Sequence, residues 1–280
     1  MKRLTKLSLA AASLALMTAG AAAQGKVITF ATEGAYAPWN FTEAGGKLNG
    51  YEIELGADLC KRAKLECKFV AQDWDGIIPA LTAGKYDAIM AGMTATDKRK
   101  ETIDFSISYG STPNGFMTTK SSVAAKLPGT GSSFGLVKEA DAAKKVIDDM
   151  KVLLKGKTIG VQVSTTNSAF IDKYFKGTAE IREYKTTEQH DLDLAAGRID
   201  AVFAAMSYAS DAVKKPENKD FVLAGATFSG DVLGSGVGIG LRKTDTALKA
   251  QLDEAIKGAL ADGTIKTLSV KWFGFDITPK

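Results

Sequence analysis

Two segments of this chain repeat each other closely. Residues 83–94 (AGKYDAIMAGMT) and 196–207 (AGRIDAVFAAMS) share Ala, Gly, Asp, Ala, Ala and Met in register, and most other positions exchange similar residues. Each copy has the pattern of a helix end, a glycine at the C′ position, a short apolar strand opened by Asp-Ala, and small residues where the strand stops. The copies lie a domain length apart, which favours two similar α/β lobes whose strand ends bind a ligand. The alternative is two unrelated βαβ units that share only small and apolar residues.

The order of the expected elements favours two lobes. Strands and helices alternate twice along the chain, which is typical of mainly parallel sheets with helices on their faces and predicts the fold class α/β. The first set comprises strands at 27–31, 67–71 and 87–90 and helices at 51–63 and 76–83. The second set comprises strands at 158–161, 180–184 and 200–203 and helices at 168–174 and 188–196.

The remaining segments complete the expected domain organisation. Residues 119–154, with a helix at 141–154, are interpreted as an insertion of the second lobe. The glycine-alternating stretch 234–241 is expected to be a strand that crosses back into the first lobe. Asp245 is expected to cap a helix, and a short amphipathic helix follows it around 265–272. The expected boundaries are 1–23 for a signal peptide, 24–112 and 236–280 for lobe 1, and 113–235 for lobe 2.

The first residues predict export. Lys2, Arg3 and Lys6 precede an uncharged apolar stretch at 7–17, and the alanines at 21–23 complete a signal peptidase pattern. The apolar run is too short to span a bilayer. The formal net charge is +4, and these three basic residues leave with the leader. The nearly neutral mature chain argues against a nucleic-acid partner.

The chain has two cysteines, Cys60 and Cys67, at an expected helix end and at the start of the next strand. In an exported protein this spacing favours one local disulfide, and two free buried thiols are the alternative. A metal site needs more ligands than this segment offers, because the single histidine, His190, is far away in sequence. We therefore expect no metal.

Two loops of the first lobe carry candidate ligand groups. Glu33 and Tyr36 follow the first strand, where an acid and an aromatic ring can bind a cation; a solvated acid and a packing tyrosine are the alternative. Trp74 precedes a helix at another strand end and can form the opposite wall of a slot with Tyr36. Thr96 can cap a helix that contains Arg99, whose guanidinium suits a carboxylate. An Arg on a charged helix surface is the interpretation that this segment alone favours.

The second lobe offers an anion site. Gln162 leads into Ser164, Thr165, Thr166 and Asn167 at a helix start, where free N–H groups and hydroxyls favour a carboxylate over a phosphate. Helix capping explains one of the three hydroxyls. His190 is expected on the outer face of its helix, and the chain has no nucleophile motif. We expect no catalysis and no cofactor.

Several motifs together resemble the family of periplasmic solute-binding proteins that serve polar amino acid ABC importers. They are residues 50–63 (GYEIELGADLCKRA), 36–38, 85–88, 98–99, 262–265 and 271–273. The resemblance implies a type II two-lobed periplasmic binding protein fold with two crossover hinge strands, a monomeric periplasmic receptor, and an inner-membrane ABC permease as its partner. The Cys60–Cys67 disulfide matches the branch that binds basic amino acids and opines.

The resemblance also implies the site. Arg99, Thr94 and the Thr165 region would clamp the ligand's α-carboxylate, Tyr36 and Trp74 would sandwich its side chain, and Glu33 would meet a guanidinium. The implied ligand contacts are Glu33, Tyr36, Trp74, Ala91, Gly92, Thr94, Arg99, Gln162, Ser164, Thr165, Thr166, Asn167, Ala205 and Ser207.

One position departs from the family pattern. Receptors for free amino acids typically place an Asp that receives the α-ammonium where this chain has Ala205. A secondary amine with a second carboxyl arm needs that Asp less, so the chain resembles octopine- and nopaline-binding receptors. Thr94 narrows the pocket and favours the octopine-like ligand over nopaline. A receptor for arginine, lysine, ornithine or histidine, a dehydratase-like enzyme on the same fold, and a partner of a sensor kinase are the alternatives.

Overall fold

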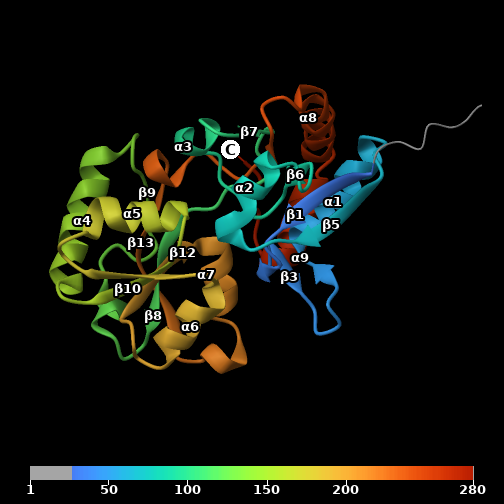
Figure 1. Ribbon diagram of the computed structural model, residues 1–280. Coiled ribbons are helices and arrows are strands. Elements are labelled where there is room, and N and C mark those ends of the chain that lie inside the picture. Colours follow the sequence, from blue (N-terminus) through green and yellow to red (C-terminus); the bar gives the residue numbers. More distant parts are fainter. Residues whose placement is uncertain (1–26, 280) are drawn as a thin grey trace, which may run out of the picture.

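The structure is a computed structural model that describes residues 27–279, in two lobes that each contain a β-sheet covered by helices (Figure 1). The expected signal peptide lies outside the described residues. One lobe holds the sheet β5-β1-β6-β14-β7, and the other holds the sheet β11-β10-β12-β8-β13-β9. The two-lobed α/β architecture predicted from the sequence is confirmed.

The helices and strands have the following bounds. The strands are β1 Ile28–Thr32, β2 Ala35–Tyr36, β3 Asn40–Thr42, β4 Leu48–Asn49, β5 Cys67–Ala71, β6 Ala88–Ile89, β7 Asp104–Phe105, β8 Asn114–Thr119, β9 Ser133–Gly135, β10 Thr158–Gln162, β11 Glu180–Tyr184, β12 Ala201–Ala205, β13 Phe221–Ser229 and β14 Gly240–Leu241. The α-helices are α1 Tyr51–Arg62, α2 Ile77–Thr82, α3 Asp97–Lys100, α4 Ala140–Leu154, α5 Thr166–Phe175, α6 Thr187–Ala195, α7 Met206–Ala212, α8 Thr246–Ala261 and α9 Thr264–Phe273. Short 3₁₀ helices are η1 Trp74–Gly76, η2 Val123–Lys126, η3 Pro216–Asn218 and η4 Asp231–Leu233.

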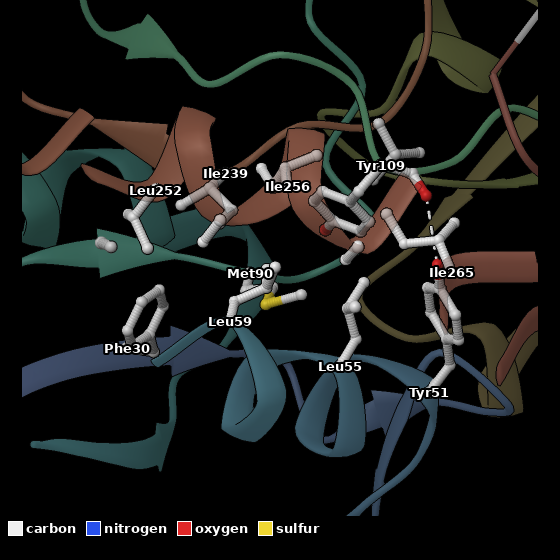
Figure 2. Close-up of a cluster of buried hydrophobic side chains, with 14 of the residues drawn as sticks. Phe30, Tyr51, Leu55, Leu59, Met90, Tyr109, Ile239, Leu252, Ile256 and Ile265 are labelled. Carbon is white, nitrogen blue, oxygen red and sulfur yellow. Dashed lines mark hydrogen bonds between the residues drawn. The ribbon is translucent and has the colours of Figure 1, made fainter. Parts of the chain in front are cut away.

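Helices cover both faces of the first sheet, and alternate residues of each strand point to opposite faces. Phe30 and Met90 pack in a cluster with residues of α1, α8 and α9 (Figure 2). Ala31 and Ile89 pack on the other face with residues of η1 and α2. Strands β1, β5 and β6 are parallel, and β14 runs antiparallel to β6 and β7. The parallel strands therefore end at one edge, which carries Glu33 and Ala91.

The second sheet follows the same rule. Phe203 packs with residues of α4 and α5, and its neighbours Val202 and Ala204 pack with residues of α6 and α7. Strands β10, β11 and β12 are parallel, and β8 lies antiparallel between β12 and β13.

The repeated segments perform the same structural task in both lobes. Gly84 and Gly197 adopt positive φ values of 76° and 68° after a helix end, where a glycine suffers no Cβ penalty. Asp87 Oδ2 accepts a hydrogen bond from the Thr29 amide, and Asp200 Oδ2 accepts one from the Thr158 amide. Each aspartate thus joins its strand to the start of the neighbouring strand, and the repeat is a genuine structural duplication.

Two crossover segments join the lobes, one between β7 and β8 and the other between β13 and β14. They meet at an antiparallel bridge between Gly110 and Val237. The regular strand expected at 234–241 is wrong for most of its length, since only Gly240 and Leu241 form β14. Gly234 and Gly236 have φ values of 73° and 122°, which interrupt an extended strand.

Other local expectations have mixed outcomes. The disulfide between Cys60 and Cys67 is present, with an S–S distance of 2.08 Å. The helix after residue 245 is present, but the Asp245 side chain makes no capping hydrogen bond. Its carboxylate lies 2.8 Å from Arg242 Nε instead, because an ion pair competes with the cap.

Candidate functional site

A cavity lies between the two lobes, at the strand ends of both sheets. The empty space in and around it is about 850 Å³ when open solvent is included, and the centre of a water-sized sphere can occupy about 70 Å³ of it. Twelve of the predicted contact residues line it: Glu33, Tyr36, Trp74, Ala91, Gly92, Thr94, Arg99, Gln162, Thr165, Thr166, Asn167 and Ala205. The folding topology therefore brings together residues that are up to 172 positions apart in the sequence.

Two predicted residues, Ser164 and Ser207, do not line this cavity. The Ser207 side chain is buried and accepts a hydrogen bond from Trp39 Nε1 at 2.9 Å. Ser164 has a positive φ of 60°, and its carbonyl oxygen accepts a hydrogen bond from Arg99. Both residues join the lobes to each other, since Trp39 and Arg99 belong to the first lobe.

Arg99 lies on α3, whose first turn is fixed by the Thr96 side chain accepting from the Arg99 amide. Its Nη1 donates to the Thr94 carbonyl at 2.8 Å, and its Nη2 donates to the Ser164 carbonyl at 3.2 Å. The guanidinium carbon lies 5.1 Å from the centre of the Trp74 ring. Burial lowers the pKa of Arg99 to about 10, so the group stays cationic at neutral pH. The side chain is half-buried and lines the cavity, where it also reaches the second lobe, so it does not lie free on the helix surface.

Glu33 follows β1 and is 9% exposed. Gln162 of the second lobe donates from Nε2 to Glu33 Oε1 at 2.6 Å. Burial raises the pKa of Glu33 to about 7; the Gln162 hydrogen bond lowers it, and the charges of Asp73 and Glu52 raise it further. The solvated-acid interpretation is therefore wrong. A cationic ligand group beside Glu33 would restore the charged form.

The aromatic rings of Tyr36 and Trp74 line the cavity from the first lobe. The Tyr36 ring stacks on the Tyr208 ring of the second lobe, with centroids 5.4 Å apart and planes 10° apart. Trp74 carries the Arg99 guanidinium on its face, and its buried Nε1 has no hydrogen-bond partner among the described residues. Asn167 Oδ1 is likewise buried and unpartnered within the described chain. Such atoms in a cavity wall are candidates for ligand contacts.

Glu52, which was not predicted as a site residue, holds the strand end at Gly92 through a hydrogen bond. Glu52 is fully buried and accepts hydrogen bonds from the Gly92 amide and Asn40 Nδ2, both at 2.7 Å, and from the Tyr109 hydroxyl. Burial raises the pKa of Glu52. A Cβ at Gly92 would lie 3.0 Å from the Tyr36 ring, so glycine is needed there for close packing.

The position of the missing acid is at the end of the second repeat. Ala205 is the last residue of β12 and precedes α7. Its partner across the sheet is Asn114 of β8, which also lines the cavity. Among the described lining residues Glu33 is the sole carboxylate and Arg99 the sole Lys or Arg. The wall therefore offers one anion, one cation, and a neutral amide beside Ala205.

His190 corrects another expectation. Its side chain is 1% exposed and lines the cavity, whereas an outer-face position was predicted. The buried residues of α6 are Thr187, His190 and Leu194, which define the inward face of the helix. Thr112, Ser229 and Gly230 also line the cavity and were not predicted: Thr112 and Gly230 lie in the crossover segments, which carry no periodic signal, and Ser229 is the last residue of β13. No group of three or more His, Cys, Asp or Glu residues among 27–279 is arranged to hold a metal ion. No helix in that range is long and apolar enough to cross a membrane.

Comparison with known proteins identifies the family. Residues 28–275 match the bacterial extracellular solute-binding proteins, family 3. The chain is 50% identical to an octopine-binding periplasmic protein of Rhizobium meliloti, over 97% of this chain and 98% of that protein. It is 32% identical to an L-arginine-binding protein of Pseudomonas aeruginosa, over 99% of this chain and 98% of that protein.

A solved structure leads to the same family. The periplasmic His/Glu/Gln/Arg/opine family-binding protein from Silicibacter pomeroyi in complex with lysine aligns with a TM-score of 0.71 at 35% identity. The alignment covers 91% of this chain and 100% of that one. The type II two-lobed binding-protein fold is thereby confirmed, and these relatives are binding proteins. The chain belongs to the bacterial extracellular solute-binding proteins of family 3.

Proposed function

We propose that this chain is a periplasmic receptor of an ABC importer that binds an arginine-derived opine of the octopine type between its two lobes. The observation that carries the proposal is the charge pattern of the cavity. Glu33 suits a guanidinium, Arg99 suits an α-carboxylate, and Ala205 stands where an acid for a primary ammonium is typical of the family. The 50% identity to an octopine-binding protein supports it.

Each end of the ligand has a matching group. A guanidinium beside Glu33 forms a charge-assisted pair in a buried site, with the aromatic rings of Tyr36 and Trp74 on either side of the ligand chain. The α-carboxylate takes Arg99, Thr94 and the hydroxyl and amide groups of the α5 N-terminus. Ala91, Gly92, Gln162, Thr166 and Asn167 complete the contacts, and Thr165 Oγ1 is engaged in capping Ser168.

The amine distinguishes an opine from a free amino acid. A buried primary ammonium without an anion is strongly unfavourable, by several kcal/mol. In an opine the nitrogen carries a second carboxyl arm, whose negative charge lies close to the ammonium and offsets it. The arm fits beside Ala205, where Asn114 supplies a neutral amide rather than a repelling carboxylate. Thr94 narrows the cavity and favours octopine over the larger nopaline.

A receptor for a basic amino acid is the second candidate. The identity to an arginine-binding protein and the lysine-bound structure of a relative favour it. Glu33 and Arg99 serve arginine equally well, so the two candidates differ at the amine alone.

We also propose the surrounding organisation. A leader at 1–23 directs export to the periplasm; residues 24–112 with 236–280 form lobe 1, and residues 113–235 form lobe 2. The receptor acts as a monomer, without cofactor or catalysis, and delivers its ligand to an inner-membrane permease. The catalytic alternative, a dehydratase-like enzyme, predicts turnover of a prephenate-like substrate.

Titration calorimetry on the mature protein tests the function. Bound ligand is removed by unfolding and refolding, and octopine, nopaline, arginine and lysine are titrated in turn. We expect octopine to bind at least about tenfold more tightly than nopaline or arginine, a difference of about 1.4 kcal/mol. Tight arginine binding with no octopine heat would refute the opine and leave the basic amino acid receptor.

A further inference from the structure

His190 is the one histidine in the chain, and it is built into the wall of the cavity. The helix that carries it, α6, starts with a reciprocal capping box between Thr186 and Gln189. This cap fixes the helix start, and Thr187, His190 and Leu194 then face the sheet. His190 packs against Gly160 of β10, where an added Cβ would lie 3.4 Å from His190 Cβ, an ordinary contact distance; the same Cβ would clash with an Ile199 methyl group at 2.6 Å.

His190 and Glu33 both line the cavity, and strand β10 connects their surroundings. Gly160 and Gln162 project from the same face of β10, because they are two residues apart on a strand. His190 packs against the first of these residues, and the second donates its hydrogen bond to Glu33. The His190 ring also contacts Tyr208 edge-on, and Tyr208 stacks on Tyr36.

A hydrogen-bond chain fixes the proton on this ring. His190 Nδ1 lies 2.9 Å from Asp191 Oδ1, and Asp191 Oδ2 accepts from the Tyr208 hydroxyl at 2.5 Å. An ionised carboxylate can only accept, so Nδ1 is the donor. In a neutral imidazole with a protonated Nδ1, the other nitrogen, Nε2, is an acceptor.

A guanidinium needs more acceptors than Glu33 provides. It carries five N–H donors, and the two Glu33 oxygens already include one that accepts from Gln162. Donors left unpaired in a buried site are costly. We propose that His190 is a specificity-determining residue of this receptor, whose ring accepts a hydrogen bond from the ligand's guanidinium through Nε2. The proposal deepens the proposed function and rests on its guanidinium ligand.

Nuclear magnetic resonance on the uniformly ¹⁵N-labelled mature protein tests the proton position directly. A single histidine gives one pair of ring nitrogen signals, so no assignment to a residue is needed, and Nε2 is told from Nδ1 by its two-bond coupling to both carbon-bound ring protons. We expect the Nδ1-protonated form without ligand and an upfield shift of the Nε2 signal when octopine is added. An Nε2-protonated ring, or an Nε2 signal that octopine leaves in place, overturns the proposal.

Calorimetry on variants distinguishes a direct contact of His190 with the ligand from a structural role in which His190 holds Tyr208 in place. His190→Phe keeps a ring in the buried space, and His190→Gln keeps a polar acceptor. Octopine is compared with its norvaline-derived counterpart, which has the same carboxylates and amine but no guanidinium. We expect His190→Phe to weaken octopine binding about tenfold or more and to leave the norvaline-derived ligand nearly unchanged, with partial recovery in His190→Gln. Equal losses for both ligands, or none, overturn the proposal.

The same comparison works if the proposed opine is wrong. Should the protein bind arginine and not octopine, arginine and norvaline replace the two opines. The role of His190 is then judged on the same ratio, while the opine assignment fails separately. Should His190→Phe not fold, the resonance shifts of the unmodified protein and the His190→Gln titrations decide the question.

Discussion

Replacing Glu33 with Gln should make the ligand-free protein more stable and the receptor worse. The buried Glu33 carboxyl has a pKa of about 7 in the folded chain, against 4.5 for an ordinary glutamate. The folded state therefore holds a proton that the unfolded state releases between these two values. Its contribution to the free energy of unfolding is most favourable below pH 4.5 and falls as the pH rises to about 7. The full difference is at most about 3.4 kcal/mol, from 1.36 kcal/mol per pKa unit.

The glutamine side chain has no proton to lose, so the variant escapes this penalty. We expect the difference in unfolding free energy between Glu33→Gln and the unmodified protein to be small at about pH 4 and to grow toward about 3 kcal/mol at about pH 8. Urea unfolding of ligand-free protein, followed by circular dichroism at several pH values, measures it. Glu66→Gln, an exposed carboxyl outside the cavity, is the matched control and should show no such trend.

Binding should change in the opposite direction. Leaving a buried guanidinium without its carboxylate costs about 2–4 kcal/mol, so octopine should bind roughly 30- to 1000-fold more weakly to Glu33→Gln at about pH 8. Octopine affinity of the unmodified protein should rise with pH up to about pH 7, because binding must displace the Glu33 proton, and the variant should lose this dependence. A Glu33→Gln protein that is less stable at that pH and binds octopine normally would refute the assignment.

Three further predictions follow from the same geometry. Ala205→Asp should raise the ratio of arginine affinity to octopine affinity by about tenfold or more, because the new carboxylate receives a primary ammonium and repels the second carboxyl arm of the opine. Competition calorimetry measures this ratio, and an unchanged ratio contradicts the role of Ala205. Arg99→Ala should weaken every carboxylate ligand by about 100-fold or more, since the cation that faces the carboxylate is lost; a loss confined to one ligand contradicts it. Replacing both Cys60 and Cys67 with Ser should lower the free energy of unfolding by about 2.5 kcal/mol, given their separation of 7 residues, and leave ligand affinity nearly unchanged. Thermal unfolding checks the stability, and calorimetry checks the affinity.

Much of the framework was predictable because it depends on local patterns. β5 and β11 begin and end where the apolar runs predict, and the helix at 141–154 starts only one residue earlier. The strand at 234–241 failed for a physical reason, since glycines at positive φ adopt a backbone that no strand pattern records. The alternation of glycine with apolar residues indicates an extended segment, but it does not give the backbone dihedral angles.

The site was less predictable wherever the second lobe decides the environment. Arg99 on a charged helix is surface-like by sequence, and its place in the cavity wall depends in part on a hydrogen bond to a carbonyl 65 residues away. His190 was expected on the outer face of its helix. Leu192 is 59% exposed, whereas Thr187 and His190 are buried. The inward face of α6 carries two polar side chains beside Leu194, so the rule that the apolar side of a helix faces the core does not predict its orientation.

In each copy of the repeat, the residue that holds the sheet together is different from the residues at the strand end beside the cavity. The aspartates of the repeat, Asp87 and Asp200, hold neighbouring strands in both lobes through the same hydrogen bond. The strand ends that follow have diverged: Gly92 donates its amide to Glu52, whereas Ala205 pairs with Asn114 and leaves its small side chain in the wall. Because the β12 ladder depends on backbone groups, a change at position 205 alters the charge of the cavity without disturbing the sheet. Ligand preference in this chain can therefore shift through a single strand-end side chain, while the duplicated aspartates keep both lobes intact.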